Sequence, residues 1–374
     1  MKFHHRDNSC ILILSDLHLG AGRLISNRKN CLEDFHYDKE LVEFINYHSK
    51  LAKETSPVEI IINGDFFDLL AVPFVPFFDD EFWSEQAALS KLEMIINAHQ
   101  EVIHAIQLFL RHPYTKLTYI LGNHDAEIIL PALQARVRTL FETGDHSFQL
   151  LLNDQETYQP LPKIVVKHGH EFEVAHHFNR DSMIKDAHGR YFFIPPWGSY
   201  YVSRIINKFK EERDYINAVR PINKFIINGL IYDTLFTLRF GFMNFTYFFM
   251  VRFLMIFKQN KKLSEVVKNV KKEMHLFQDY ESLTENDLIN NQAVKALIVG
   301  HTHDPIFREY DNGNIFINTG TWTKMYNLDF GKNFQGARLT YARIDVKDYA
   351  KEKYLIQLNE WKGILENPYK EFHF

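Results

Sequence analysis

Apolar runs in this sequence repeatedly end in a short group of Asp, Asn and His residues. The runs are short, continuous and rich in Ile, Val and Leu, which is typical of strands buried on both faces. They cover residues 10–14, 58–62, 117–121, 164–166 and 294–299. Helical spacing of apolar residues over 35–51 and 85–110 separates the first three runs. This alternation predicts a sheet with parallel strands and helices on its faces.

The polar groups that follow these runs are predicted to meet at one edge of the sheet, because ligands in such folds bind beyond the carboxyl ends of the strands. In chain order the groups are Asp16 and His18; Asn63, Asp65 and Asp68; Asn123, His124 and Asp125; His168 and His170; and His301 and His303. After His303 the stretches "NIFINTG", "ARLTYARIDV" and "KYLIQLNEW" predict antiparallel strands that complete a second sheet. The expected fold is α/β, a two-sheet sandwich flanked by helices.

The residue types in these groups are typical of a metal centre. Carboxylate, imidazole and amide-oxygen ligands together suit Mn, Fe or Zn better than Mg or Ca, and the absence of Cys from the set argues against a structural zinc site. There are more His and Asp residues than one ion needs, which favours two ions that share a carboxylate and clamp a phosphoryl group. Each motif alone has a plainer interpretation, since Gly-Asn-His-Asp is usually a turn. Five such groups in series favour metal chemistry.

The motifs "DLH", "GDFFD", "GNHD", "HGH" and "GHTH" occur in this order. The order resembles that of the calcineurin-like metallophosphoesterase superfamily, and the resemblance covers residues 16–303. It implies two divalent metal ions, with Mn expected first and Fe or Zn as alternatives. By this resemblance one metal binds Asp16, His18 and His303, the other binds Asn123, His168 and His301, and Asp65 bridges them.

The resemblance also implies catalytic residues beside the metals. His124 matches the family's catalytic histidine, which contacts a phosphate oxygen and is not a ligand, and Asp125 would orient its ring. The implied reaction is in-line attack on phosphorus by a metal-bound hydroxide, while His124 stabilises charge or protonates the leaving oxygen. The expected function is a metal-dependent phosphohydrolase acting on a phosphodiester or pyrophosphate bond.

Several substrates are compatible with these motifs. The nearest branch is the UDP-2,3-diacylglucosamine pyrophosphatase-like group, which has the same motif order and a helical insertion that holds acyl chains. Its third motif is typically Gly-Asn-Arg-Asp, whereas this chain has His124. The alternatives are a DNA exonuclease with similar motifs, a soluble small-molecule phosphodiesterase or protein phosphatase, and a metal-binding scaffold without catalysis. A nucleic-acid partner is less expected, because the residues after His303 look like core strands.

Residues 171–290 predict a helical, Phe-rich and basic insertion within a core formed by residues 1–170 and 291–374. Residues 200–272 carry 14 Lys and Arg against 5 Asp and Glu, a net charge of +9 in a chain of net charge −4. This segment fits an anionic membrane surface or lipid, and a cap with an ordinary Phe core is the plainer alternative. Its longest run without a charge is twelve residues, and spanning a bilayer needs about 20. For His176, His177 and His188, early in the insertion, substrate contact and ordinary polar roles are both open.

Cysteine content and the N-terminal sequence predict a location. Only Cys10 and Cys31 are present, so no disulfide framework is expected and a reducing compartment is favoured. The first apolar run is five residues long, shorter than the core of a signal peptide. We therefore expect a cytoplasmic protein, with the inner face of the membrane as the place for any peripheral binding.

Overall fold

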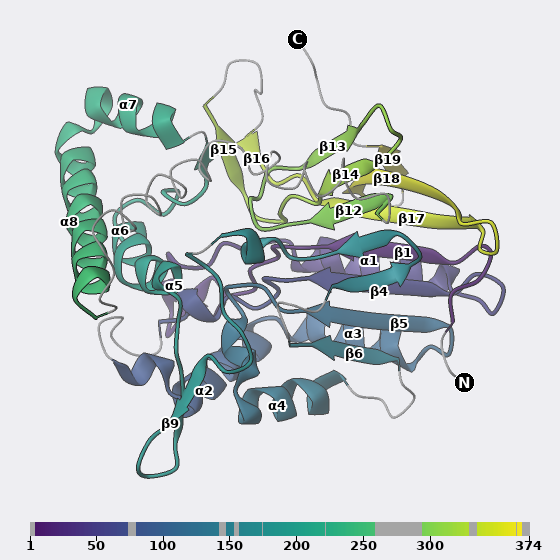
Figure 1. Cartoon of the computed structure of the whole chain (residues 1–374), viewed down its shortest axis with the longest axis horizontal. Helices are drawn as coiled ribbons and strands as arrows, with labels where there is room; N and C mark the ends of the chain where they lie inside the picture. Colours follow the sequence, from purple (N-terminus) through teal and green to yellow (C-terminus); the bar gives the residue numbers. More distant parts are fainter. Residues whose placement is uncertain are drawn as a thin grey trace.

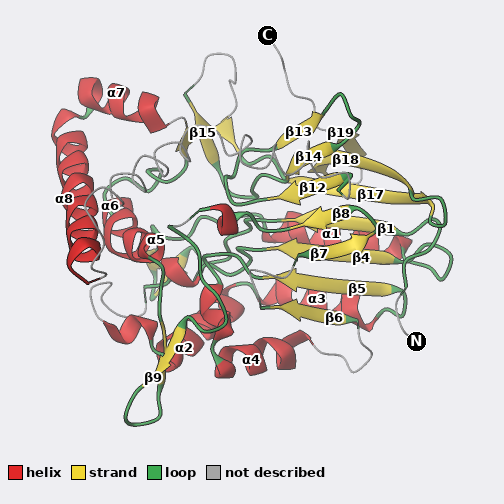
Figure 2. Cartoon of the chain, in the orientation of Figure 1, coloured by secondary structure: helices red, strands yellow, loops and turns green. Residues whose placement is uncertain are grey.

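The structure is a computed structural model that describes residues 4–73, 80–141, 147–152, 157–173, 175–220, 222–258, 294–328, 335–363 and 365–368. Two β-sheets lie face to face, and helices cover the outer face of one of them (Figure 1, Figure 2). The predicted α/β fold with two main sheets is confirmed. The carboxyl ends of the parallel strands point toward the helices of the insertion (Figure 1).

The larger sheet contains the first three predicted strands as parallel neighbours. Its order is β19-β18-β17-β1-β4-β5-β6, and β1, β4, β5 and β6 pair in parallel. The strands are β1 (Cys10–Leu14), β4 (Val58–Asn63), β5 (Thr115–Ile120), β6 (Phe148–Leu151), β17 (Thr340–Asp348), β18 (Lys353–Lys362) and β19 (Leu365–Pro368). Their polar ends therefore lie side by side.

The smaller sheet contains the fourth and fifth predicted strands. Its order is β13-β14-β12-β8-β7, with β8, β12 and β14 parallel. The strands are β7 (Tyr158–Leu161), β8 (Ile164–Val166), β12 (Ala296–Val299), β13 (Ile306–Glu309) and β14 (Ile315–Asn318). Ile11, Ile13 and Ile61 of the larger sheet pack against Ile164 and Ile298 of the smaller one in a core between the sheets.

Two of the C-terminal strands join a different sheet from the one expected. β14 lies in the second sheet as predicted, but β17 pairs antiparallel with β1 of the first sheet, and β18 pairs with β17. The alternation in β17 buries Ala342, Ile344 and Val346 in the core between the sheets. Alternation identifies a half-buried strand but not its neighbour, so the sequence left the choice of sheet undetermined.

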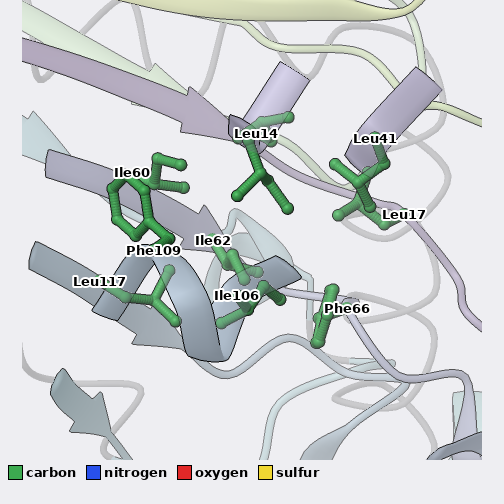
Figure 3. A pocket seen from close by; sticks show the side chains of 10 residues that line it. Leu14, Leu17, Leu41, Ile60, Ile62, Phe66, Ile106, Phe109 and Leu117 are labelled. Atoms are coloured by element: carbon green, nitrogen blue, oxygen red, sulfur yellow. The ribbon is translucent and has the colours of Figure 1, made fainter. Parts of the chain in front are cut away.

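Helices cover the outer face of the larger sheet. They are α1 (Asp38–Leu51), α2 (Glu85–Ala98), α3 (Gln100–Arg111) and α4 (Pro131–Phe141). Figure 3 shows the apolar side chains that meet between α1, α3 and this sheet, among them Leu41, Phe109 and Ile60. The single helix predicted over 85–110 is two helices that break at His99, whose Nδ1 lies 2.5 Å from Asp38 Oδ1 on α1. A tertiary contact therefore overrides the continuous helical pattern.

The described part of residues 171–290, the predicted insertion, contains a small hydrophobic cluster. This part contains β9 (Met183–Lys185), β10 (Tyr191–Phe193), α5 (Trp197–Tyr201), a π-helical turn (Val202–Ile206), α6 (Asn207–Lys210), β11 (Val219–Arg220), α7 (Ile222–Tyr232) and α8 (Thr234–Lys258). Ile205, Phe209, Ile216 and Phe236 pack together there. Among the helices in the described ranges, none is long and apolar enough to cross a membrane. The predicted insertion residues 259–290, which include part of the basic segment, lie outside the described residues.

Shorter elements complete the structure. The hairpin strands β2 (Leu24–Ile25) and β3 (Arg28–Lys29) follow the first motif, and β15 (Met325–Asn327) and β16 (Gln335–Gly336) follow the last. β15 pairs with β11 of the insertion. Short 3-10 turns occur at Leu69–Ala71, Asp80–Trp83, Ala126–Ile129 and His170–Phe172. The first and third come directly after motifs, and the last begins at the final residue of "HGH".

Candidate metal centre

The predicted site residues meet beyond the carboxyl ends of the parallel strands. Three groups of His and acidic residues each have ligand atoms within 4.8 Å of one another. They are Asp16, His18 and His303; His18, Asp68 and His124; and Asp65, His168 and His301. Residues that are far apart in the sequence thus form one cluster, as the strand-end pattern predicts.

Five of these residues have a left-handed backbone conformation that residues other than Gly rarely adopt. The φ angle is 52° at Asp16, His18 and Asp65, 72° at His301 and 67° at His303. Such conformations cost of order 1–3 kcal/mol each and concentrate at functional sites. Backbone strain therefore marks the same edge of the fold as the side-chain chemistry does.

Two motif glycines allow the strand ends to approach closely. A Cβ atom added to Gly64, where φ is 83°, would collide with the ring of His168. One added to Gly122 would collide with the carboxylate of Asp65. The glycines beside the polar residues therefore keep space for candidate ligand side chains from other strand ends.

Asp16, His18 and His303 form the first half of the centre. His18 Nε2 lies 3.0 Å from His303 Nε2, and His303 Nε2 lies 3.4 Å from Asp16 Oδ1. The side chain of Asp16 is fully buried and accepts hydrogen bonds from the backbone N–H of His301. Two ligands of one ion lie about 2 Å from it and hence within about 4.2 Å of each other, so these spacings suit a single cation.

Asp65, Asn123 and His168 form the second half. His168 Nε2 lies 3.3 Å from Asp65 Oδ2 and 3.3 Å from Asn123 Oδ1. The ring of His301 lies beside that of His168, with 5.3 Å between centroids. Asp65 Oδ2 is also 3.8 Å from His18 Nε2 in the first half. Asp65 thus lies between the two halves, where a bridging carboxylate is needed.

The orientation of His168 fits a bound cation. Its Nδ1 is 2.8 Å from the backbone carbonyl of Asn63, which can only accept a hydrogen bond, so Nδ1 carries the proton. In the neutral ring, Nε2 then presents a lone pair to Asp65, which is repulsive unless a cation lies between them. Burial lowers the pKa of His168, but the charges of Asp65 and Asp16 outweigh it and raise the pKa to about 10. The same charges attract a proton or a divalent cation.

His18 is held in a similar way. Its Nδ1 lies 3.0 Å from Asp68 Oδ2, and its Nε2 faces the other candidate ligands. Hydrogen bonds at the second ring nitrogen usually fix the orientation of metal-binding histidines. The donor types, spacing and ring orientation together fit a pair of divalent cations.

His124 contacts Asp68 and not Asp125, which corrects the expected partner of its ring. His124 Nδ1 lies 2.8 Å from Asp68 Oδ1. The Asp125 carboxylate instead accepts hydrogen bonds from Gly122 N, Phe66 N and Tyr119 Oη. The Asp125 carboxylate is thus engaged by these three donors, and Asp68 is the carboxylate that contacts the ring of His124. Burial, followed by the charge of Asp65, raises the pKa of Asp125 to about 7.

Asp68 is charged despite its burial. Burial raises the pKa of its carboxyl, but the charges and hydrogen bonds of His124 and His18 outweigh this effect and hold the pKa below its ordinary value. Asp68 also accepts a hydrogen bond from Ala71 N at the start of a 3-10 turn. It therefore orients two site histidines from a rigid position.

The remaining histidines of the motifs and the insertion occupy three different environments: the core, the exposed surface and the edge of the candidate metal centre. His170 is fully buried and stacks on Phe178, with 4.9 Å between centroids, so it packs in the core. His177 and His188 are exposed. Glu173 and His176 instead lie beside His301 and form a fourth group of ligand atoms within 4.8 Å. The sequence prediction did not include Glu173, although its Glu-x-x-His spacing with His176 is a known ligand pattern.

Comparison with known proteins agrees with this geometry. Residues 11–305 match the family model of calcineurin-like phosphoesterases. The fold and site define a metallophosphoesterase, a hydrolase with a candidate dimetal site. The chain belongs to the calcineurin-like phosphoesterase family. No curated protein matches the sequence.

Solved structures of low sequence identity also align with the chain. A dimetal phosphatase from Danio rerio is 11% identical, with a TM-score of 0.40 over 97% of this chain and 100% of that chain. An archaeal phosphodiesterase is 12% identical, with a TM-score of 0.33 over 93% of this chain and 99% of that chain. Zinc-bound Vps29 from Entamoeba histolytica is 11% identical, with a TM-score of 0.30 over 96% of each chain. These likenesses carry no conclusion about substrate.

Proposed function

We propose that the protein hydrolyses a phosphodiester or pyrophosphate bond in an amphipathic, lipid-linked or nucleotide-linked substrate. Two divalent ions would be held by the predicted ligands, and Mn²⁺ is the first candidate. Those ligands are Asp16, His18 and His303 for one ion, Asn123, His168 and His301 for the other, and Asp65 for both. Family membership and the clustered ligand atoms support the hydrolytic part of this proposal.

Bound divalent ions would neutralise charge on the phosphoryl oxygens and make water more acidic. His124 would supply the proton for the leaving oxygen. Asp68 holds Nδ1 of His124, so Nε2 is the nitrogen available for that oxygen. Asp68 also stabilises the protonated form of the ring, since burial lowers the pKa of His124 but the charges of Asp68 and Asp65 raise it above its ordinary value.

The amphipathic part of the proposal rests on one face of α8. Leu235, Leu238, Phe242, Phe245 and Phe249 follow one another at intervals of three and four residues, which places them in one stripe along α8. Their exposed fractions range from 58% to 83%. The other side of α8 packs Phe236 into the core of the insertion. A contiguous apolar surface of this kind usually marks a binding face, and it suits acyl chains or a bilayer interface.

Part of the basic charge predicted for residues 200–272 is paired among the residues that the structure describes. Several cations of the insertion pair with carboxylates, which lowers their attraction for an anionic surface. The pairs are Arg204–Asp80, Lys208–Glu211, Lys210–Asp34, Arg213–Asp233 and Arg239–Glu212. We therefore propose that apolar burial is the main contribution to binding and that residues 171–290 act as a cap for an acyl-bearing substrate at the inner membrane face.

A triple variant, Leu235→Glu, Phe242→Glu and Phe249→Glu, tests this proposal. Purified, Mn²⁺-loaded protein is assayed against small diesters, pyrophosphates, UDP-diacylglucosamine and DNA, and its binding to anionic liposomes is measured by co-sedimentation. We expect the variant to lose liposome binding and to show a lower ratio of UDP-lipid to small-diester turnover. Leu108→Glu, on the exposed side of α3, is the matched control and should retain both properties.

Three other outcomes would redirect the proposal. Preferred turnover of DNA or of a soluble diester would contradict the amphipathic substrate. A wild-type chain that is dimeric, with the triple variant monomeric, would assign the apolar stripe to a second copy of the chain. Absence of hydrolysis of every substrate by metal-loaded protein would contradict the enzymatic proposal itself.

A further inference from the structure

Glu173 and His176 lie at the edge of the proposed metal centre, outside the family's motif residues. Glu173 Oε2 is 3.2 Å from His301 Nε2 and 3.5 Å from His176 Nε2. The ligand atoms of Glu173, His176 and His301 lie within 4.8 Å of one another, and His301 also belongs to the group that contains Asp65 and His168. A cation bound at Nε2 of His301 is therefore within reach of Glu173 as well.

We propose that Glu173 is an additional carboxylate ligand of the ion held by Asn123, His168 and His301. This inference rests on the metal centre proposed above. The 3.2 Å separation of Glu173 Oε2 and His301 Nε2 is within the limit of about 4.2 Å for two ligands of one ion. The Glu173 side chain is 26% exposed and that of His301 only 8%, so Glu173 approaches the centre from its open side.

His176 is the positioning residue that links Glu173 to Asn123. Asn123 Nδ2 lies 3.4 Å from His176 Nδ1 and can donate a hydrogen bond to it, which leaves Asn123 Oδ1 facing His168. With Nδ1 accepting, His176 carries its proton on Nε2, the nitrogen that faces Glu173 Oε2. One ring thus orients the amide oxygen and the carboxylate toward the same place.

Backbone contacts hold the turn between Glu173 and His176 in position. His176 N donates to Glu173 O over 3.0 Å, which forms a turn with both side chains on the same side. Gly198, in the first turn of α5, donates its N–H to Ala175 O over 2.8 Å. A Cβ atom at Gly198 would lie 2.6 Å from Ala175 O and from His176 Cε1. Residues 195–198 ("PPWG"), which lead into α5, therefore fit directly against the segment that carries Glu173.

A third carboxylate changes the charge balance of the centre. Asp16 and Asp65 give two negative charges against two divalent ions, and Glu173 makes three. Carboxylate ligands favour harder ions such as Mn²⁺ over softer ones. Glu173 should therefore strengthen Mn²⁺ binding at the second position and leave the first position unchanged.

The test is a Mn²⁺ titration of the full chain, with free Mn²⁺ measured by electron paramagnetic resonance and bound metal by elemental analysis. We expect two ions in the wild type. In Glu173→Gln one of the two dissociation constants should rise by about 10–100-fold, with the other unchanged. Glu173→Asp keeps the charge on a shorter side chain, so its dissociation constant should lie between those of the wild type and Glu173→Gln. Glu211→Gln removes an exposed carboxylate of the same insertion and should behave as wild type.

The outcomes separate this inference from the proposal beneath it. Two ions bound to Glu173→Gln with wild-type affinity would overturn the ligand role of Glu173 and leave the dinuclear centre intact. Fewer than two ions in the wild type would overturn the centre and with it this inference. Circular dichroism of Glu173→Gln and Glu173→Asp confirms that any change in affinity belongs to a folded chain.

Discussion

Replacing His124 with alanine is expected to lower turnover by about 10²–10⁴-fold, the usual contribution of a positioned acid. The ring is in place for this role because Asp68 holds its Nδ1 at 2.8 Å. Metal content should stay at the wild-type level, since His124 is not one of the proposed metal ligands. The measurement is steady-state kinetics on a diester with a poor leaving group, together with elemental analysis.

Two comparisons isolate the acid role of His124. On a substrate whose leaving group needs no proton, His124→Ala should recover a large part of the lost rate. His104→Ala, at an exposed histidine on α3, should match the wild type on both substrates. Unchanged turnover of the poor leaving group by His124→Ala would rule out proton donation by this residue.

Replacing Lys91 with methionine is expected to destabilise the fold by about 3–5 kcal/mol, the usual cost of leaving one member of a buried ion pair without its partner. Lys91 Nζ lies 2.7 and 2.8 Å from the two carboxylate oxygens of Glu127, and both side chains are almost fully buried. The ammonium group also lies 3.6 Å from the centroid of the Phe82 ring. Lys91→Met would leave the Glu127 carboxylate in an apolar environment, three residues after His124.

The double variant Lys91→Met with Glu127→Leu provides the control. It replaces the pair by apolar side chains of similar size, so it should recover most of the stability lost in the single variant. Urea unfolding of the wild type, both single variants and the double variant completes the cycle. Two results would contradict this role of the Lys91–Glu127 ion pair in stability. One is a Lys91→Met variant as stable as the wild type, and the other is a double variant less stable than either single variant.

The strand ends and the polar residues that follow them were predictable because two independent patterns coincide there. Buried strands appear in the sequence as apolar runs, and each run ends at polar residues that are rarely found in a hydrophobic core. Parallel pairing then brings those stops together at one edge. The motif resemblance supplied the division into two ligand groups, and the structure places Asp65 between them.

Other features depended on contacts that a single sequence does not encode. The family resemblance made Asp125 the expected partner of His124. In this turn its carboxylate instead accepts a hydrogen bond from Gly122 N, and Asp68 lies beside the ring. The break at His99 depends on Asp38 of another helix. Among the motif histidines, only His168 and His170 are close to Glu173 in the sequence. In the fold, Glu173 forms a turn with His176, and its carboxylate lies beside the ring of the distant His301.

The central claim is that one chain holds two metal ions through a shared carboxylate, and metal analysis of wild type and Asp65→Ala tests it most directly. Asp65 Oδ2 lies 3.3 Å from His168 Nε2 and 3.8 Å from His18 Nε2, one nitrogen from each half of the centre. We therefore predict about two divalent ions per wild-type chain, and loss of both high-affinity binding and hydrolysis in the folded variant. Two fully occupied ions in Asp65→Ala would contradict the shared-carboxylate centre.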